Sequence, residues 1–520
     1  MQKEINLILR PKQATDEKFF LPIAAKKLNI SIEEISQYRI IKKSIDARKP
    51  NIKINLKLLI IINEENFIFE NTLFDYQNVS NKEEVVIIGT GPAGLFAALR
   101  LIELGLKPIL FERGKDVSER KLDIAKINRE QIVNPDSNYA FGEGGAGTFS
   151  DGKLYTRSKK RGSVKRILDI LNLHGASQEI LYEAHPHIGT NKLSGVIKEI
   201  RETILNAGGE IHFNSKLTDI KTVDNTVKSI TINNNQEIDV KRLVLATGHS
   251  ARDVYEILHK NEILIEPKAF AIGVRVEHPQ KLVDSIQYHC EIRSDYLPAA
   301  NYNLVKQIDG RGVYSFCMCP GGFIVPAATE QNQIVVNGMS PAKRDSKYAN
   351  SGIVVEIKHE DLKDFEEYGA LAGVKYQEFI ENLAHKNGGD GQIAPAQRLK
   401  DFVEGKKSES LPETSYHPGV VSSDIHKWLP ENISKRLQKG FVEFNKSMKG
   451  YLTNEAIILG VESRTSSPVR IPRDKETLEH TQIKGLYPCG EGAGYAGGIV
   501  SSAVDGERIA EKIKSAIQSN

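Results

Sequence analysis

The first 80 residues alternate between short apolar and polar stretches that predict a small α+β module. Residues 5–9 are rich in Ile and Leu and predict a short strand. Residues 52–58 alternate apolar and polar side chains with a period of two, which is typical of a half-buried strand. Ser31 and Glu34 have the spacing of a capping box, so we expect a helix to begin there. Polar residues 78–82 predict the linker that follows.

Beyond the linker, the apolar pattern is that of a strand–helix–strand unit. Residues 85–88 form a continuous apolar run, as expected for a strand of a parallel sheet that is covered on both faces. A glycine-rich turn, a helical segment at 93–104 and a second apolar strand at 108–111 follow. Further elements expected from such patterns are helices at 193–207 and 499–517, and strands at 210–213, 227–232, 237–240 and 243–248.

Composition narrows the class of protein. A chain of 520 residues with 40% hydrophobic and 26% charged residues is typical of a soluble globular protein with several domains. The 70 Lys and Arg and the 67 Asp and Glu leave a net charge of +3, which argues against a protein dedicated to polyanions. Four Cys exclude a disulfide scaffold and fit a reducing compartment. Since no apolar stretch is long enough for a signal peptide or a membrane helix, we expect a cytoplasmic protein.

Glycines in the turn after residue 88 carry the main chemical signal. Gly89, Gly91 and Gly94 match the dinucleotide-binding pattern G-x-G-x-x-G. The first glycine permits a tight turn, the second lets a pyrophosphate approach the backbone, and the third lets the helix pack closely on the strand. Glu112 ends the second strand about 20 residues further on, where an acid can hydrogen-bond an adenosine ribose. This context disfavours the alternative, a glycine turn in an unrelated α/β protein.

A second glycine-rich turn indicates which dinucleotide to expect. Glu112 argues against NADP, whose 2′-phosphate it would repel, but it does not separate NAD from FAD. The sequence shows no second strand–GxGxxG–helix unit, whereas residues 490–499 place another glycine-rich turn before the last helix. A long cofactor with two ends needs two such sites, and the amides of Gly498 and Ile499 could stabilise negative charge on a reduced flavin. The sequence therefore predicts FAD.

These motifs resemble a known group of flavoproteins. Residues 85–113, 246–248 and 490–494 resemble the glutathione-reductase-type FAD fold, near its branch of aromatic hydroxylases and geranylgeranyl reductases. The whole chain is similar to a bacterial family of uncharacterised FAD-dependent dehydrogenases. The segments that carry this closer resemblance are 44–48, 141–154, 248–253, 315–322, 460–468 and the closing glycine-rich segment.

The resemblance implies a tightly held FAD and a redox activity whose substrate is not established for the family. Where the wider superfamily has an Asp that contacts the flavin ribityl chain, this sequence has Glu491. From the motifs and the resemblance together, we expect the cofactor to contact Gly89, Gly91, Pro92, Ala93, Gly94, Glu112, Arg113, Gly145, Thr247, Gly248, Glu491, Gly498 and Ile499.

The expected architecture is an α/β fold with a discontinuous Rossmann-like FAD-binding domain. We expect its first part at residues 81–264 and its C-terminal return at 456–520. An α+β substrate domain at 265–455 interrupts it, and the small α+β module at 1–80 precedes it.

Three residues are candidates for catalysis, each with an alternative interpretation. Cys317 and Cys319 form a C-x-C pair, which differs from the C-x-x-C of redox dithiols. The sequence has no second Cys pair to complete the four ligands of a metal site, so no metal is predicted. The two thiols could equally be small buried residues of a strand. His249, just beyond Thr247 and Gly248, could be an acid–base group or a flavin contact, or could cap a helix or bond a phosphate.

Two further features are open to more than one interpretation. Residues 142–151 carry four Gly in their first six positions, and could lie along the cofactor or form a flexible surface loop. The two Phe residues near this segment favour the cofactor. Arg464, Arg470 and Arg473 could orient an anionic substrate or the phosphates of NAD(P)H, or could be solvated loop charges.

Together these features predict an FAD-dependent oxidoreductase that transfers hydride between flavin N5 and a small-molecule substrate, with NAD(P)H considered as a transient electron donor. The main alternative is a flavin-dependent RNA-modifying enzyme in which residues 1–80 grip nucleic acid. That module has 13 Lys and Arg and 10 Asp and Glu, a weaker basic excess than nucleic-acid-binding modules usually show. A non-catalytic FAD-binding protein is the third interpretation. The sequence specifies neither the substrate, the direction of reaction nor the oligomeric state.

Overall fold

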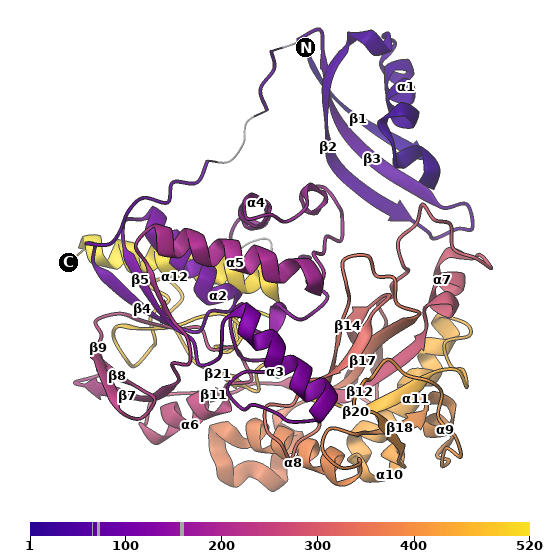
Figure 1. Cartoon of the computed structure of the whole chain (residues 1–520). Helices are drawn as coiled ribbons and strands as arrows, with labels where there is room; N and C mark the ends of the chain where they lie inside the picture. The colour runs from indigo at the N-terminus through magenta and orange to yellow at the C-terminus, as the bar shows by residue number, and fades with distance from the viewer. Residues whose placement is uncertain (65, 70–72, 157–160, 520) are drawn as a thin grey trace.

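A computed structural model describes residues 1–64, 66–69, 73–156 and 161–519 of the chain. Figure 1 shows an N-terminal module, drawn in indigo, above two larger lobes. One lobe contains a parallel sheet and both ends of the predicted discontinuous domain, and the other contains a large, mostly antiparallel sheet from the middle of the chain. The protein therefore has the predicted α/β fold with a discontinuous Rossmann-type domain.

The N-terminal module is a three-stranded sheet with one helix. The central strand β3 (Lys53–Ile62) pairs antiparallel with both β1 (Gln2–Leu9) and β2 (Ile35–Asp46), and α1 (Glu17–Leu28) packs against the sheet. In β3, Ile54, Leu56, Leu58 and Ile60 are buried, whereas Asn55, between the first two, is exposed. The period-two pattern at 52–58 thus correctly predicted a strand with one buried face.

The predicted helix after Ser31 is wrong. The capping interaction exists, because the Ser31 amide donates a hydrogen bond of 2.8 Å to the Glu34 carboxylate. However, Ile32–Glu34 make a single 3₁₀ turn, and β2 begins at Ile35. The following segment contains four Ile and one Tyr, residues that favour a strand, and it gains hydrogen bonds by pairing with β3. Pairing with a neighbouring strand therefore overrides the local helix signal.

The first lobe contains five parallel strands in the order β22, β10, β4, β5, β6. Their side chains alternate between two hydrophobic cores. In β4, Val85 and Ile87 pack on the side of the helices, whereas Val86 and Ile88 pack on the side of an antiparallel meander. The strands are β4 (Glu84–Ile88), β5 (Lys107–Phe111), β6 (Glu210–His212), β10 (Leu243–Leu245) and β22 (Leu486–Pro488).

Helices and the meander cover the two faces of this sheet. The helices of the first core are α2 (Pro92–Glu103), α4 (Val164–Leu173), α5 (Thr190–Asn206) and α12 (Ile499–Ser519). The second core contains β7 (Leu217–Val223), β8 (Thr226–Ile232), β9 (Gln236–Asp239) and α6 (Arg252–Lys260). Burial on both faces explains why β4 is a continuous apolar run.

The second lobe is built around a seven-stranded sheet in the order β13, β14, β17, β12, β20, β18, β19. All neighbours are antiparallel except β18 and β19. The strands are β12 (Phe270–Pro279), β13 (Val305–Ile308), β14 (Arg311–Cys319), β17 (Tyr348–Ile357), β18 (Ala394–Arg398), β19 (Val420–Ser422) and β20 (Ile457–Glu462).

Strand β20 lies beyond the expected end of the substrate domain at residue 455. It nevertheless pairs with β12 and β18 inside the seven-stranded sheet. The sheet therefore continues to Glu462 before the chain returns to the first lobe. A short apolar run does not reveal which sheet a strand joins, because fully buried strands of either lobe have the same pattern.

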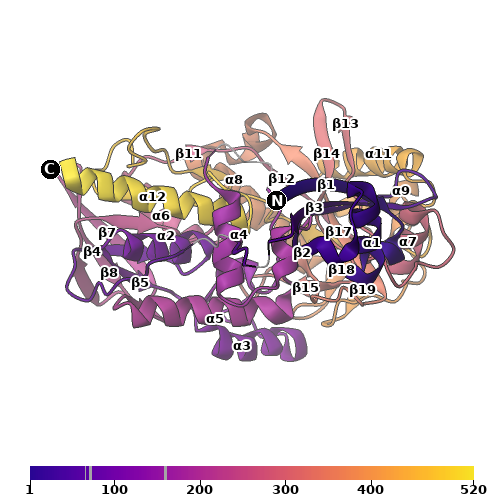
Figure 2. The same cartoon turned by 90° about the horizontal axis from the view of Figure 1, so that it is seen from above.

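The remaining elements lie around the two main sheets (Figure 2). They are α3 (Val117–Glu130), β11 (Glu266–Pro267) with β21 (Val469–Arg470), α7 (Gln280–Tyr288), β15 (Phe323–Pro326) with β16 (Val336–Met339), α8 (Ala372–Lys386), α9 (Leu399–Glu404), α10 (Ile425–Trp428) and α11 (Glu431–Ser447). Within the described ranges, no helix is both long and apolar enough to cross a membrane.

Candidate functional site

The glycine turn between β4 and α2 has the close contacts that its sequence predicts. Gly89 has φ +100°, and a Cβ there would lie 2.5 Å from the Ala246 carbonyl oxygen of the neighbouring strand segment. A Cβ on Gly94 would lie 2.0 Å from the Gly89 carbonyl oxygen. Both positions therefore require glycine for the fold itself, since any side chain would clash with backbone.

Gly91 differs from its two neighbours because it faces open space. A Cβ there would meet the Gly145 Cα at 3.9 Å, and its φ of −69° is accessible to any residue. Gly91 is the N-cap of α2, so the free amides and positive dipole of this helix point toward that space. The absence of a side chain here leaves room for an anion rather than relieving strain.

Glu112, at the end of β5, is held by four hydrogen bonds from the protein. One carboxylate oxygen accepts from the Thr90 amide at 2.9 Å and the Thr90 hydroxyl at 2.8 Å. The other accepts from the amides of Gly114 and Gly142, each at 3.0 Å. A ribose hydroxyl would have to share one of these oxygens, because the four donors already use the carboxylate's acceptor positions.

The charge of Arg113 is also used within the protein. Its guanidinium donates to Asp136 and Asp253 at 2.7 and 2.9 Å and lies 4.1 Å above the Phe141 ring. It lines the site as part of a stacked, ion-paired wall. Two carboxylates already balance its charge, so it is poorly suited to holding a phosphate.

The glycine-rich segment 142–147 is ordered by Arg120, which the sequence analysis missed. Arg120 is fully buried in α3 and donates to the carbonyl oxygens of Asn138, Tyr139, Gly142, Glu143 and Gly145. Burial lowers the pKa of this guanidinium to about 10, so it remains protonated at neutral pH. A Cβ on Gly142 would lie 2.5 Å from Arg120 Cδ. The segment is therefore a packed loop, and no local signal points to an arginine 22 residues earlier.

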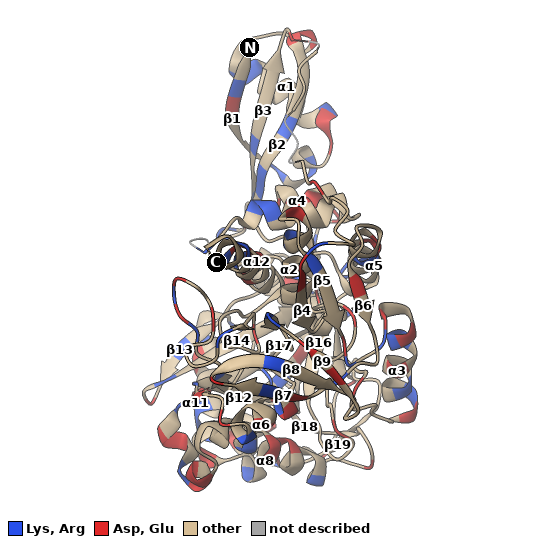
Figure 3. Cartoon of the chain, turned by 90° about the vertical axis from the view of Figure 1, so that its left-hand side faces the viewer, with Lys and Arg blue, Asp and Glu red and all other residues tan. Residues whose placement is uncertain are grey.

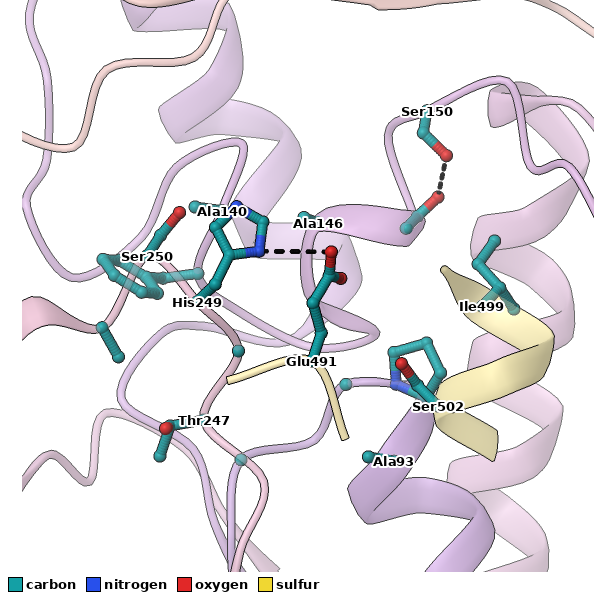
Figure 4. A pocket seen from close by; sticks show the side chains of 18 of the residues that line it. Ala93, Ala140, Ala146, Ser150, Thr247, His249, Ser250, Glu491, Ile499 and Ser502 are labelled. Carbon is teal, nitrogen blue, oxygen red and sulfur yellow. Dashed lines mark hydrogen bonds and ion pairs between the residues drawn. The ribbon is translucent and has the colours of Figure 1, made fainter. Parts of the chain in front are cut away.

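The start of α12 forms a second open position near the first. Gly498 precedes Ile499 at the helix start, and a Cβ on Gly497 or Gly498 would meet nothing within 4 Å. Ile499 packs on Gly147, and Gly506 allows α12 to lie against α2, where a Cβ would approach the Ala93 carbonyl oxygen to 2.1 Å. Figure 4 shows Ala93 of α2 near Ile499 and Ser502 of α12 at one side of the pocket.

His249 and Glu491 face each other across the same pocket (Figure 4). His249 Nδ1 lies 3.4 Å from the Glu491 carboxylate, and Nε2 lies 3.1 Å from the Arg464 carbonyl oxygen. A carbonyl oxygen can only accept, so the ring carries a proton on Nε2. The hydrogen bond from Nε2 orients the imidazole, and Nδ1 attracts the Glu491 carboxylate only when it also carries a proton.

These features surround one cavity of about 340 Å³ between the two lobes. Its walls include all of the predicted cofactor residues except Gly94, which lies beneath the turn, and all three catalytic candidates. The residues of this set are Gly89, Gly91, Pro92, Ala93, Glu112, Arg113, Gly145, Thr247, Gly248, Glu491, Gly498, Ile499, His249, Cys317 and Cys319.

The residues present fit FAD. Two helices of at least 12 residues begin at the cavity, and glycines leave the space in front of both starts open. One helix start suits a pyrophosphate, and the other suits the polar edge of a flavin ring. Apolar and aromatic wall residues such as Ile88, Phe111 and Phe141 suit the flat ring systems.

The two candidate cysteines lie at the cavity wall formed by the second lobe. Cys317 has φ +45° in an irregular part of β14, where the pairing with β17 shifts between Phe316 and Cys319. Desolvation by the cavity walls raises the pKa of the Cys317 thiol to about 12, although this residue is exposed to the cavity, and burial raises that of Cys319. Both thiols are therefore protonated at neutral pH, and neither has the character of a nucleophile or a metal ligand.

We expect Cys317 to resist alkylation at neutral pH although it is accessible from the cavity. With a pKa of about 12, its thiolate fraction is roughly a thousandfold below that of an unperturbed thiol. Mass spectrometry of iodoacetamide-treated protein would measure this, with the partly exposed Cys290 as internal control. Labelling of Cys317 should still rise by roughly tenfold per pH unit between about pH 8 and pH 10. Equal labelling of both cysteines at pH 7 would contradict the expectation.

The arginines near the C-terminus are mostly engaged in internal ion pairs. Arg464 is buried and bonds Glu381, and Arg473 is buried and makes two hydrogen bonds to Asp505 at 2.9 and 2.6 Å. Asp505 also accepts from the Gly490 amide, so this pair anchors the closing glycine segment. Of the three arginines considered as anion-binding candidates, only Arg470 is exposed. Arg464 and Arg473 are therefore structural ion-pair partners rather than solvated charges.

Three parts of the chain match known protein families. Residues 83–263 match the pyridine nucleotide-disulphide oxidoreductase family, residues 269–465 match the family described as FAD-dependent protein, C-terminal domain-like, and residues 1–61 match a domain of unknown function. Among solved structures, a geranylgeranyl bacteriochlorophyll reductase-like protein from Thermoplasma acidophilum is 14% identical, with 84% of this chain and 80% of that chain covered and a TM-score of 0.35. A flavin-dependent brominase is also 14% identical, with the same coverage of both chains and a TM-score of 0.36.

A bacterial relative matches nearly the whole chain. An uncharacterized protein of Clostridium beijerinckii is 45% identical over 507 residues, which cover 94% of each protein. The cofactor is FAD, and the enzyme type is that of FAD-dependent oxidoreductases. This chain belongs to the same family as the clostridial protein, and in it a region that matches an oxidoreductase family precedes residues 269–465, which match a C-terminal domain of FAD-dependent proteins.

Proposed function

We propose that the protein transfers a hydride between FAD and a small-molecule substrate that enters the cavity between the two lobes. The observation that carries the proposal is the composition of the cavity walls. The first lobe contributes the starts of α2 and α12, and the second contributes Phe316, Cys317 and Asn337. A site for the cofactor alone would not need the wall from the second lobe.

Each end of the site has a distinct task in this proposal. The start of α2 at Gly91 holds the pyrophosphate, and the start of α12 at Gly498 and Ile499 binds the polar edge of the ring. FAD, when bound, supplies the N5 atom that accepts or donates a hydride. The Arg464 carbonyl oxygen accepts the Nε2 proton of His249 and so orients the ring beside Glu491. The protein positions the substrate and limits the access of water to the reacting atoms.

The charges of the N-terminal module support a small-molecule substrate over nucleic acid. Figure 3 shows Lys and Arg side by side with Asp and Glu on this module. Lys57 pairs with Glu4 at 2.6 Å, and Lys43 pairs with Glu183 of the first lobe at 3.1 Å. Carboxylates therefore neutralise part of the basic surface that a nucleic acid would need.

Anaerobic reduction of the bound flavin tests the proposed function. The holoenzyme would be mixed with NADH, with NADPH and then with a panel of metabolites, and the loss of oxidised-flavin absorbance would be followed by stopped flow. We expect rapid reduction by at least one of these compounds, or reoxidation of the reduced protein by one of them. If dithionite reduces the flavin but no nicotinamide or metabolite changes its redox state, the protein binds FAD without turnover and the proposal fails.

A further inference from the structure

Lys153 lines the cavity but has no assigned role in the FAD site. It follows the glycine-rich segment and forms a β-bridge with His187. Its ammonium group donates to the carbonyl oxygen of Met318, the residue after Cys317, and so joins the first lobe to β14. The side chain lines the cavity and is 39% exposed. Two of its three N–H donors therefore point to no partner among the described residues.

The carboxylate nearest to Lys153 is that of Asp151, and its charge is already paired with Arg344. Asp151 accepts two hydrogen bonds from Arg344, at 3.0 and 2.5 Å, in a bidentate pair that is nearly inaccessible to solvent. Lys153 Nζ lies 3.8 Å from Asp151, beyond hydrogen-bond distance. One carboxylate thus serves two cations, and this cluster carries a net charge of +1 at the cavity wall.

The titratable neighbours of Lys153 add no negative charge at neutral pH. Burial raises the pKa of Cys317 to about 12 and also raises the pKa of Cys319. Burial and the charge of Arg344 lower the pKa of His187, so its ring is neutral. Burial opposes ionisation of Asp151, but the charges of Arg344 and Lys153 lower its pKa overall, so it is the anion already counted.

The other basic side chains at the cavity have closer partners. Arg113 is shared by Asp136 and Asp253. Lys216 lies 3.1 Å from Asp253 and 3.4 Å from Asp136. Arg464 is buried, shares Glu381 with Arg252, and uses its other donors on Thr329 and Gln333. Among the described residues of the wall, Lys153 is therefore the position where an incoming anion gains the most favourable electrostatic interaction.

The side chains of the cavity wall indicate the chemical character of the rest of a ligand whose anionic group binds Lys153. Phe316 and Tyr155 line the same cavity. A side chamber of about 60 Å³ adjoins it, sharing Ser150 and Asn337 with the main cavity. The apolar part of its lining is formed by Tyr139, Phe149, Val325, Ala327 and Val335, and its polar part includes His249, Glu462 and Arg464. A molecule held here would place its apolar body against these side chains.

We propose that Lys153 is the anion-binding residue of the substrate pocket, and that the substrate is an organic carboxylate with an apolar body. The ammonium group of Lys153 would bind the carboxylate through its two remaining N–H donors. This inference rests on the proposed function, because it places the substrate beside the bound FAD.

Ligand binding to the oxidised holoenzyme tests the inference without turnover. Benzoate is the probe, and benzamide is its uncharged counterpart of the same shape. Binding would be measured by calorimetry and by the shift of the flavin absorbance. We expect saturable benzoate binding and at least tenfold weaker binding of benzamide, which corresponds to about 1.4 kcal/mol.

Two matched variants test whether Lys153 is the lysine that binds the carboxylate of benzoate. Lys153→Met should weaken benzoate binding by at least tenfold, with unchanged FAD content and melting temperature. Lys216→Met removes a lysine from the same cavity whose charge is already paired, and it should bind benzoate as the wild type does. Lys153→Arg should restore part of the affinity, because it keeps the charge.

Several results would overturn the inference. These are no saturable benzoate binding to the wild type, equal binding of benzamide, or unchanged benzoate affinity in Lys153→Met. A Lys153→Met protein that loses FAD but still binds benzoate would show that the lysine serves the cofactor. Failure of the proposed function looks different, since benzoate would bind through Lys153 while the flavin stayed inert to every nicotinamide and metabolite.

Discussion

A Gly91→Leu variant should fold normally but purify without FAD. The backbone at Gly91 has φ −69°, which any residue can adopt, and a Cβ would meet no atom closer than 3.9 Å. The leucine side chain would instead fill the space at the start of α2 that we assign to the pyrophosphate. Each lost charge-assisted hydrogen bond is worth about 1.5–3 kcal/mol, so we expect the affinity for FAD to fall by at least ~100-fold.

Flavin absorbance of the purified protein and titration of the apoprotein with FAD would measure this loss. Gly195→Leu is the matched control, because Gly195 lies at an exposed position of α5 with open space around its Cβ. It should keep full FAD content. Gly89→Ala provides the contrast, since its φ of +100° and a contact of 2.5 Å with Ala246 should lower the melting temperature itself. A Gly91→Leu protein that is as yellow as the wild type would refute the assignment.

A Glu381→Gln variant should be destabilised by about 3–5 kcal/mol, the range observed when one partner of a buried ion pair is removed. Glu381 of α8 is fully buried and accepts hydrogen bonds from Arg252 of the first lobe and from Arg464 and Ser463 of the second. The substitution would leave two buried guanidinium groups sharing one neutral amide. Thermal unfolding of the wild type and of Glu381→Gln would measure the difference in stability.

The effect of Glu381→Gln should depend on pH. Burial opposes ionisation of Glu381, but the charges of Arg252 and Arg464 outweigh it and lower its pKa to about 2. Because the folded pKa lies below the ordinary value of 4.5, the stabilisation is complete above about pH 5 and is lost as the pH falls toward 2. The gap in melting temperature between the two proteins should therefore narrow between about pH 5 and pH 3.

An exposed ion pair is the control for this prediction. Lys439 and Asp309 lie 2.7 Å apart with side chains that are 59% and 50% exposed. Asp309→Asn should leave the melting temperature nearly unchanged, because solvent screens such a pair. If Glu381→Gln behaved like Asp309→Asn at pH 7, the buried cluster would not stabilise the contact between the lobes.

The sequence alone determined the nucleotide-binding part of this protein. The turn at Gly89–Gly94 is specified locally, because Gly89 has φ +100° and a side chain on Gly94 would meet the Gly89 carbonyl oxygen. The apolar run of β4 follows from burial on both faces, and it predicts a parallel strand without knowledge of its neighbours. The second glycine turn before α12 likewise predicts a helix start. These signals depend on residues that are near one another along the chain.

The tertiary structure decided which distant residues complete the site. Arg120 orders the glycine segment, Glu381 joins Arg252 to Arg464, and β20 belongs to the sheet of the second lobe. The Ser31 capping box becomes a single turn because β2 pairs with β3. Each outcome depends on contacts between segments far apart in sequence, whose energies no local pattern records. The same holds for Lys153, whose charge matters because Arg344 already occupies Asp151.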